Sequence, residues 1–164
     1  MKTLYLLRHT HTLTAAPPPM GDLGRVLSPQ GAEEAPMVGR FMKEQSLYPD
    51  LVLSSSATRT TQTTLLVLDA LFGKDGVKAP SNFDRNLYQA SADKILSLIQ
   101  KTHPSIQRLL VVVHNPGAAN LALLLGNIEN YAPGTLTVFK ADCQSWAEFS
   151  PDSVKLEKIF VPKA

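Results

Sequence analysis

The apolar run from Leu4 to Leu7, which ends directly at Arg8 and His9, constrains the fold of this chain more than any other stretch. Four apolar residues in succession predict a strand buried on both faces, as in the middle of a mostly parallel sheet. Such sheets bind ligands at the carboxyl ends of their strands. A guanidinium beside an imidazole at that position suits a site that binds anionic oxygens and attacks the atom they surround. The alternative is a surface turn that carries a cation and a ring.

Two later stretches repeat this arrangement of a strand followed by polar side chains. The apolar residues 51–53 run into serines and a helix start that carries Arg59, where free backbone N–H groups and the helix dipole favour an anion. The run 109–113 predicts the most deeply buried strand, and it ends at His114 and Asn115. Because the carboxyl ends of parallel strands share one edge, these side chains are expected to converge with Arg8 and His9. We expect the bound anion to be phosphate.

The rest of the chain alternates between helix and strand signals. Ser28 and Pro29 are typical of a helix N-cap and first turn. The stretch from Leu13 to Arg25 is expected to be a loop, which is either a rim or lid beside the site or a solvated connection without a chemical role. Helices are predicted at 29–46, 92–102 and 118–125, and another has Arg59 in its first turn and ends at 73–76. Further strands are predicted within 77–84 and at 135–139, 146–149 and 155–160. This alternation predicts a single α/β domain over residues 1–164, with three layers, α/β/α, around a mostly parallel sheet.

Composition excludes several classes of protein. A chain of 164 residues can bury roughly 70% of the surface of its unfolded form and needs no structural metal. Its net charge of +2 comes from dispersed residues without a basic run, so nucleic acid is not indicated. Cys143 has no partner within the chain, and the first apolar run is too short for a signal peptide or a membrane span. We therefore expect a cytoplasmic protein with no membrane partner.

Taken together, three segments resemble motifs of the histidine phosphatase superfamily, also called phosphoglycerate mutase-like. Arg8-His9-Thr10 matches its Arg-His-Gly type motif, and the residues from Ser55 to Thr63 match its Ser-x-x-x-Arg-x-x-Gln-Thr segment. Residues 113–117 match the segment that bears its second histidine, and residues 25–31 are similar to the small phosphohistidine phosphatase branch.

The resemblance implies a phosphoglycerate mutase-like fold and a phosphatase without metal or cofactor. It implies that His9 attacks phosphorus and becomes a phosphohistidine, while Arg8, Arg59 and His114 hold the phosphoryl oxygens. The implied substrate is a phosphohistidine protein or a small phosphorylated metabolite. Further contacts with the substrate are expected from Thr10, Arg25, Ser55, Gln89 and Asn115.

The stretch Tyr88-Gln89-Ala90 departs from the family, because many relatives carry an acid there. Gln89 cannot donate a proton to a leaving alkoxide, which argues against a phosphoglycerate mutase. A phosphoramidate such as phosphohistidine has a better leaving group and needs less help. Asp22 or Glu33 could supply the acid instead, or the site could work without one.

Two other readings remain open. The chain could be a non-catalytic or weakly active module that binds phosphorylated ligands on the same fold. The pair His9 and His11 after a first strand is also typical of metal-dependent barrel hydrolases. Those barrels need about 250 residues, however, and only two further histidines, His103 and His114, would be left to complete the metal site.

Overall fold

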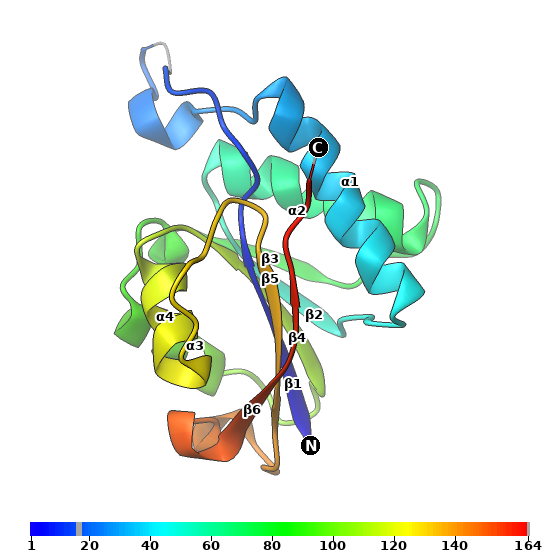
Figure 1. Cartoon of the computed structure of the whole chain (residues 1–164), viewed down its shortest axis with the longest axis vertical. Helices are drawn as coiled ribbons and strands as arrows, with labels where there is room; N and C mark the ends of the chain where they lie inside the picture. The colour runs from blue at the N-terminus through cyan, green and yellow to red at the C-terminus, as the bar shows by residue number, and fades with distance from the viewer. Residues whose placement is uncertain (16–17, 164) are drawn as a thin grey trace.

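A single mixed sheet organises the computed structural model, which describes residues 1–15 and 18–163. Six strands lie in the order β3-β2-β4-β1-β5-β6 (Figure 1). Pairing is parallel from β3 to β1 and antiparallel at β5 and β6. The strands are β1 Lys2–Arg8, β2 Leu51–Ser55, β3 Ser81–Asp84, β4 Arg108–Val113, β5 Leu136–Ala141 and β6 Val154–Phe160. The predicted mostly parallel sheet is confirmed.

Helices cover both faces of this sheet, as the sequence predicts (Figure 1). Helices α1 and α2 lie on one face, and α3 and α4 lie on the other. The helices are α1 Pro29–Glu44, α2 Thr58–Phe72, α3 Ala92–Gln100 and α4 Gly117–Gly126, with short 3-10 helices η1 Gly21–Gly24, η2 Arg85–Leu87, η3 Trp146–Glu148 and η4 Pro151–Ser153. The three-layer α/β/α architecture is therefore confirmed.

Strand β1 is apolar throughout because it contributes to two cores. Leu4 and Leu6 pack with α3 and α4, whereas Tyr5 and Leu7 pack with α1 and α2. Successive side chains of a strand point to opposite faces, so a strand covered by helices on both sides needs an unbroken apolar run. Its carboxyl end, at Arg8, is the first point at which the chain leaves these cores.

Most predicted elements are found, with one clear exception near the carboxyl terminus. The Ser28 hydroxyl caps α1 by accepting the Gly31 N–H at 3.1 Å, and an edge strand, β3, lies within 77–84. The strand predicted at 146–149 is wrong, because these residues form η3. Trp146 is fully buried there and donates its indole N–H to the Ile106 carbonyl at 2.7 Å. The aromatic residues are buried by packing beside the sheet rather than by joining it.

The loop predicted at 13–25 is found only in part. Residues 21–24 form η1, and residues 16 and 17, including the first of three prolines, lie outside the described residues. Across the described stretches of the chain, no helix combines the length and apolar character that crossing a membrane requires.

Helix α1 packs closely on α2 through Gly39, which generates a prediction about stability. A Cβ atom at this position would lie 2.5 Å from the Val67 carbonyl oxygen and 2.6 Å from the Ala70 Cβ. We expect Gly39→Ala to lower the free energy of unfolding by about 1 to 3 kcal/mol, because the two helices must separate. Urea unfolding measures this change. Glu33→Ala, at an exposed position of α1, should change stability by less than about 0.5 kcal/mol. An unchanged or more stable Gly39→Ala variant would show that the helix contact adapts easily.

Candidate active site

The parallel pairing of β1 with β4 brings two histidines together at the carboxyl edge of the sheet. Arg8 lies opposite Val113 in this register, and the His9 backbone N–H donates to the Val113 carbonyl at 3.2 Å. His9 and His114 follow directly, and their ring centroids are 5.4 Å apart. Because β2 is the other neighbour of β4, Ser55 and the start of α2 reach the same edge. The predicted convergence of the three strand ends is therefore found.

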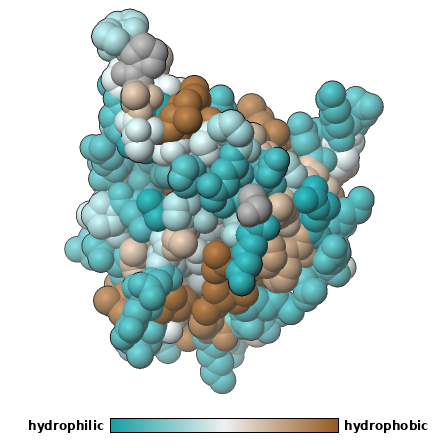
Figure 2. All heavy atoms as spheres, turned by 45° about the horizontal axis from the view of Figure 1, so that its top comes forward, coloured by the Kyte–Doolittle hydropathy of each residue, from teal (hydrophilic) through white to brown (hydrophobic). Residues whose placement is uncertain are grey.

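A cavity of about 370 Å³ opens at this edge. Figure 2 turns this end of the molecule toward the viewer, and mainly hydrophilic side chains surround it, with apolar patches beside the loop that precedes α1. The lining residues are Arg8, His9, His11, Thr12, Thr14, Asp22, Arg25, Arg59, Gln89, His114, Asn115 and Pro133. Three arginines face a single carboxylate in this set, so the cavity is suited to an anion.

The ring of His9 is held in a single orientation and tautomer. Its Nδ1 lies 2.8 Å from the Thr10 carbonyl oxygen. A carbonyl oxygen can only accept a hydrogen bond, so Nδ1 of the neutral ring carries the proton and Nε2 carries a free lone pair. Burial, together with the charges of Arg8 and Arg59, lowers the pKa of His9 to about 4, although the Thr10 hydrogen bond opposes this shift. The His9 ring is therefore neutral near pH 7, as a nucleophilic imidazole must be.

His114 has the same tautomer as His9, but here Nε2 is the ring nitrogen that makes the hydrogen bond. Its Nε2 lies 2.7 Å from the Ser55 hydroxyl oxygen, and that oxygen also accepts the Ala57 N–H at 3.3 Å. Since Ser55 can then donate its proton to Nε2, Nδ1 of His114 carries the ring proton. This Nδ1 is buried without a protein partner. Burial and the Arg59 charge lower the pKa of His114 to about 3, so the ring is a neutral donor near pH 7.

Arg8 and Arg59 also retain unused donors. Arg8 donates one terminal N–H to the Tyr131 carbonyl at 3.0 Å, and Arg59 donates both terminal groups to Asp22. The Nε atoms of both arginines are buried without a protein partner. A buried donor without an acceptor costs about 1 to 3 kcal/mol. An anionic ligand could supply the acceptors that these two arginines and His114 lack.

Asp22, in η1, closes one side of the cavity. Its carboxylate accepts hydrogen bonds from Arg59 at 3.1 Å, from Arg25 at 3.2 Å and from the Tyr88 hydroxyl. Gln89 donates to the same carboxylate at 3.3 Å and has a left-handed backbone, with φ of 53°. The hydrogen bond from Tyr88 and the neighbouring arginine charges lower the pKa of Asp22, although partial burial opposes them.

The structure separates the residues predicted from the sequence into two groups. All four predicted catalytic residues, together with Arg25, Gln89 and Asn115, line the cavity. Thr10 does not line it: its side chain is fully buried, and its hydroxyl donates to the Gly31 carbonyl at 2.9 Å. Ser55 is also absent from the lining and reaches the site only through His114.

Of the two acids proposed from the sequence, only Asp22 belongs to the site. Glu33 is exposed on α1 and does not line the cavity. Its neighbour Glu34 is buried instead and accepts the His11 backbone N–H at 3.0 Å. Successive helical side chains are about 100° apart, so these two acids face different surroundings.

Several cavity residues were not expected from the sequence, among them Thr12, Thr14 and Pro133. His11 also lines the cavity, with its Nδ1 2.6 Å from the Ser28 hydroxyl. Helix α1 approaches this segment so closely that a Cβ at Gly31 would lie 1.9 Å from the His11 carbonyl oxygen. The glycine three residues after the Ser28 cap was the available signal for this contact. Within residues 1–15 and 18–163, no three His, Cys, Asp or Glu side chains are grouped so that they could hold a metal ion.

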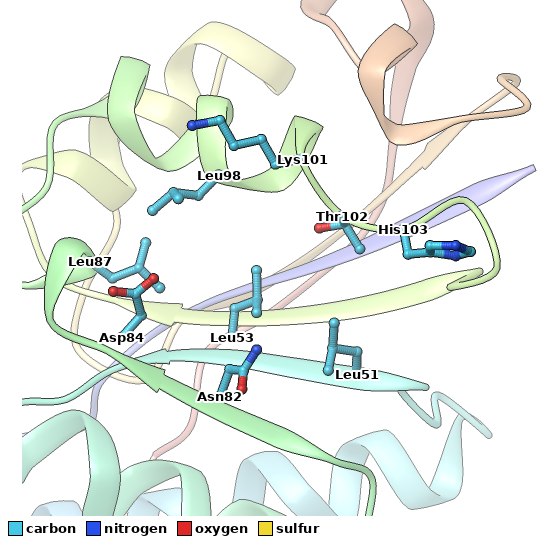
Figure 3. Close-up of a pocket in the computed structure, with 9 residues that line it drawn as sticks. All are labelled: Leu51, Leu53, Asn82, Asp84, Leu87, Leu98, Lys101, Thr102 and His103. Atoms are coloured by element: carbon cyan, nitrogen blue, oxygen red, sulfur yellow. The ribbon is translucent and has the colours of Figure 1, made fainter.

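A second, smaller cavity of about 240 Å³ lies between β2, β3 and α3. Figure 3 shows Leu51 and Leu53 on the strand side and Leu98 and Lys101 on the helix side. Its charged lining side chains, Asp84 and Lys101, are of opposite sign. None of the four predicted catalytic residues lines this cavity. The cavity at the carboxyl edge is therefore the candidate active site.

The chain was compared with known proteins by sequence. No protein-family model matches the chain. It is 27% identical to an uncharacterised protein of Mycobacterium tuberculosis over 93% of this chain and 99% of that protein. An uncharacterised chloroplastic protein of Arabidopsis thaliana is 27% identical over 98% of this chain and 78% of its own length.

Solved structures give the match in three dimensions. A protein from Agrobacterium tumefaciens assigned as the phosphohistidine phosphatase SixA has a TM-score of 0.81 and 25% identity, over 98% of both chains. A SixA assignment from Nakamurella has a TM-score of 0.85 and 24% identity, over 99% of this chain and 97% of the other. A protein histidine phosphatase SixA complexed with tungstate has a TM-score of 0.79 and 18% identity, over 98% and 97% of the two chains. The resemblance inferred from the motifs is confirmed.

The two buried histidines predict how stability depends on pH. Their pKa values of about 4 and 3 in the folded chain lie below the unfolded value of about 6.5. Between these values the unfolded chain binds more protons, so stability is lost as the pH falls from about 6.5 to 4. We expect the loss to reach about 1.4 kcal/mol per pH unit for each histidine.

Urea unfolding across this pH range would test the prediction. His9→Ala should give a shallower slope than the wild type, whereas His103→Ala, at an exposed position, should keep the wild-type slope. Equal slopes for the wild type and His9→Ala would contradict it.

Proposed function

We propose that this chain, which has the fold of the histidine phosphatase superfamily, is a phosphatase that acts through a phosphohistidine on His9. The proposed substrate is a phosphohistidine protein or a small phosphorylated metabolite, and the likeness to SixA phosphohistidine phosphatases favours the former. The proposal includes a cytoplasmic location and no metal or cofactor, both carried over from the sequence.

One observation carries the proposal: the hydrogen bond from His9 Nδ1 to the Thr10 carbonyl. It leaves the lone pair on Nε2 of a ring that lines the cavity, together with Arg8, Arg59 and His114, each of which has a buried donor without a protein acceptor. A phosphoryl group presents terminal oxygens to such donors and an electrophilic phosphorus to the nucleophile. Phosphoryl transfer depends mainly on positioning and on stabilising charge at the equatorial oxygens, which suits this arrangement.

The proposed reaction has two steps. Nε2 of His9 attacks phosphorus, the bond to the leaving group breaks, and the leaving group takes the electron pair. Water then attacks phosphorus of the phosphohistidine, and the P–N bond breaks with its electron pair returning to Nε2 of His9. Phosphate leaves, and the proton that the attacking water loses passes to the solvent. Arg8, Arg59 and His114 hold the phosphoryl oxygens in both steps, and a transition-state arginine can contribute roughly 10³- to 10⁵-fold in rate.

Protonation of the leaving group is the step for which this site is least equipped. Gln89 has no acidic proton, the pKa of Asp22 is lowered, and burial together with the Asp22 bond raises the pKa of Tyr88. Neither Asp22 nor Tyr88 is therefore a ready proton donor near pH 7. This supports substrates whose leaving group departs easily, such as phosphoramidates.

The second candidate function is a phospho-ligand binding module without turnover. The same lack of a proton donor favours it, together with the contact of Asp22 on Arg59. Turnover of an aryl phosphate separates the two functions.

His9→Ala should abolish hydrolysis of p-nitrophenyl phosphate, because it removes the nucleophile. His103→Ala, exposed and outside the cavity, should keep wild-type activity. Acid-free quenching of the wild type with labelled substrate should place the label on His9, and chelator should leave the rate unchanged. Label on another residue would refute the mechanism, and loss of activity with chelator would favour a metal hydrolase.

A leaving-group series tests the role of position 89. We expect phosphoramidates and aryl phosphates to react faster than alkyl phosphates, and Gln89→Glu to narrow that difference. The new carboxyl would lie beside Asp22 and the bound phosphoryl group, and either negative charge raises its pKa so that it holds a proton near pH 7. Glu33→Gln, away from the cavity, is the matched control. A wild type equally fast on alkyl and aryl esters, with no response to Gln89→Glu, would show that this position does not set the preference.

A further inference from the structure

Asp22 already occupies both terminal nitrogens of Arg59, one of the residues to which the proposed function assigns the phosphoryl oxygens. The Arg59 guanidinium donates to the Asp22 backbone carbonyl at 2.7 Å and to one carboxylate oxygen at 3.1 Å. Arg25 donates to the other carboxylate oxygen at 3.2 Å. One residue thus presents three oxygen atoms to two guanidinium groups at the mouth of the cavity. A phosphoryl group has the same number of terminal oxygens and a larger negative charge.

The balance of burial indicates which partner can move. Arg59 is 4% exposed and is anchored in α2, whereas the Asp22 side chain is 39% exposed. No residue of η1 is buried, and Met20 just before it is exposed. Polar contacts therefore hold η1 over the cavity, and no apolar core has to be disrupted to release it.

We infer that Asp22 is an internal competitor for the phosphoryl site, which a substrate or product must displace from Arg59 and Arg25 before it binds. The inference rests on the proposed function in one respect, that Arg59 binds the phosphoryl group. The closed arrangement lowers the apparent affinity for every phosphorylated ligand by the fraction of chains that are open. The Michaelis constant for substrate and the inhibition constant for inorganic phosphate are therefore raised together.

This role differs from that of a general acid. Loss of a general acid slows alkyl phosphates selectively and leaves phosphate affinity unchanged. Loss of an internal competitor tightens phosphate binding and leaves the ratio of alkyl to aryl rates unchanged.

Binding of inorganic phosphate to the full chain, measured by calorimetry, is the first test. Asp22→Asn removes the charge and keeps the shape, and Asp22→Ala removes both. We expect both variants to bind phosphate at least about fivefold more tightly than the wild type. Asp152→Asn, which removes an equal charge at an exposed position of η4, should stay within about twofold. Melting curves would confirm that all variants are folded.

A second measurement separates displacement from simple charge repulsion. The Arg25 backbone N–H donates to the Asp22 carbonyl at 3.1 Å in the closed arrangement. If phosphate displaces Asp22, hydrogen exchange in residues 18–25 of the wild type should become faster on phosphate binding, whereas an ordinary ligand slows exchange around its site. Tighter binding without faster exchange would indicate repulsion alone and would overturn the inference.

The remaining outcomes are also decisive. If the wild type binds phosphate and the Asp22 variants bind it equally or more weakly, Asp22 supports the site and the inference is wrong, while the proposed function stands. If no variant binds phosphate or turns over an aryl phosphate, the phosphoryl site and the inference fail together.

Discussion

The candidate site depends on the register between β1 and β4. Because β1 is apolar on both faces, hydrophobic burial alone would tolerate a shift of one residue, which would move each side chain to the other face. Polar contacts at its start oppose such a shift: the Lys2 ammonium donates to the Ile106 carbonyl at 3.0 Å, and the Thr3 N–H donates to the Gln107 carbonyl at 2.9 Å. Contacts far from the cavity therefore determine that His9 lies beside His114.

Burial gives the site its chemical character. It keeps both histidine rings neutral near pH 7 and leaves donors of Arg8, Arg59 and His114 without protein acceptors. It also lowers the pKa of Arg8, with the charges of Arg25 and Arg59 acting in the same direction. Three arginines and a single carboxylate at one cavity are electrostatically unfavourable in the empty site. The folded chain thus carries an unsatisfied positive region that an anion relieves.

The sequence was sufficient to predict the features that depend on residues close together along the chain. Strands whose apolar runs end at charged residues, and a serine that caps α1, depend on neighbours along the chain, so the sheet and the four main site residues could be predicted. Thr10 and Trp146 could not be placed, because each is oriented by one carbonyl distant in sequence, at Gly31 and Ile106 respectively. The contacts of Asp22 depend on the path of a loop, which no periodicity records. Glu33 lies outside the cavity, because the face that a residue takes on α1 is fixed by helix packing and not by its nearness in sequence to the site.

The bond between His9 Nδ1 and the Thr10 carbonyl has a further consequence for the lifetime of the proposed intermediate. A phosphoryl group carried on Nε2 of a ring that keeps its Nδ1 proton makes that ring cationic. A carbonyl oxygen is too weak a base to remove this proton, and burial disfavours the positive charge. The ring is then a good leaving group in the second step, and the phosphoryl group can occupy only one of the two ring nitrogens. In the proposed mechanism, a backbone atom that substitution of the Thr10 side chain does not remove would therefore control which ring nitrogen is phosphorylated and how fast the phosphohistidine turns over.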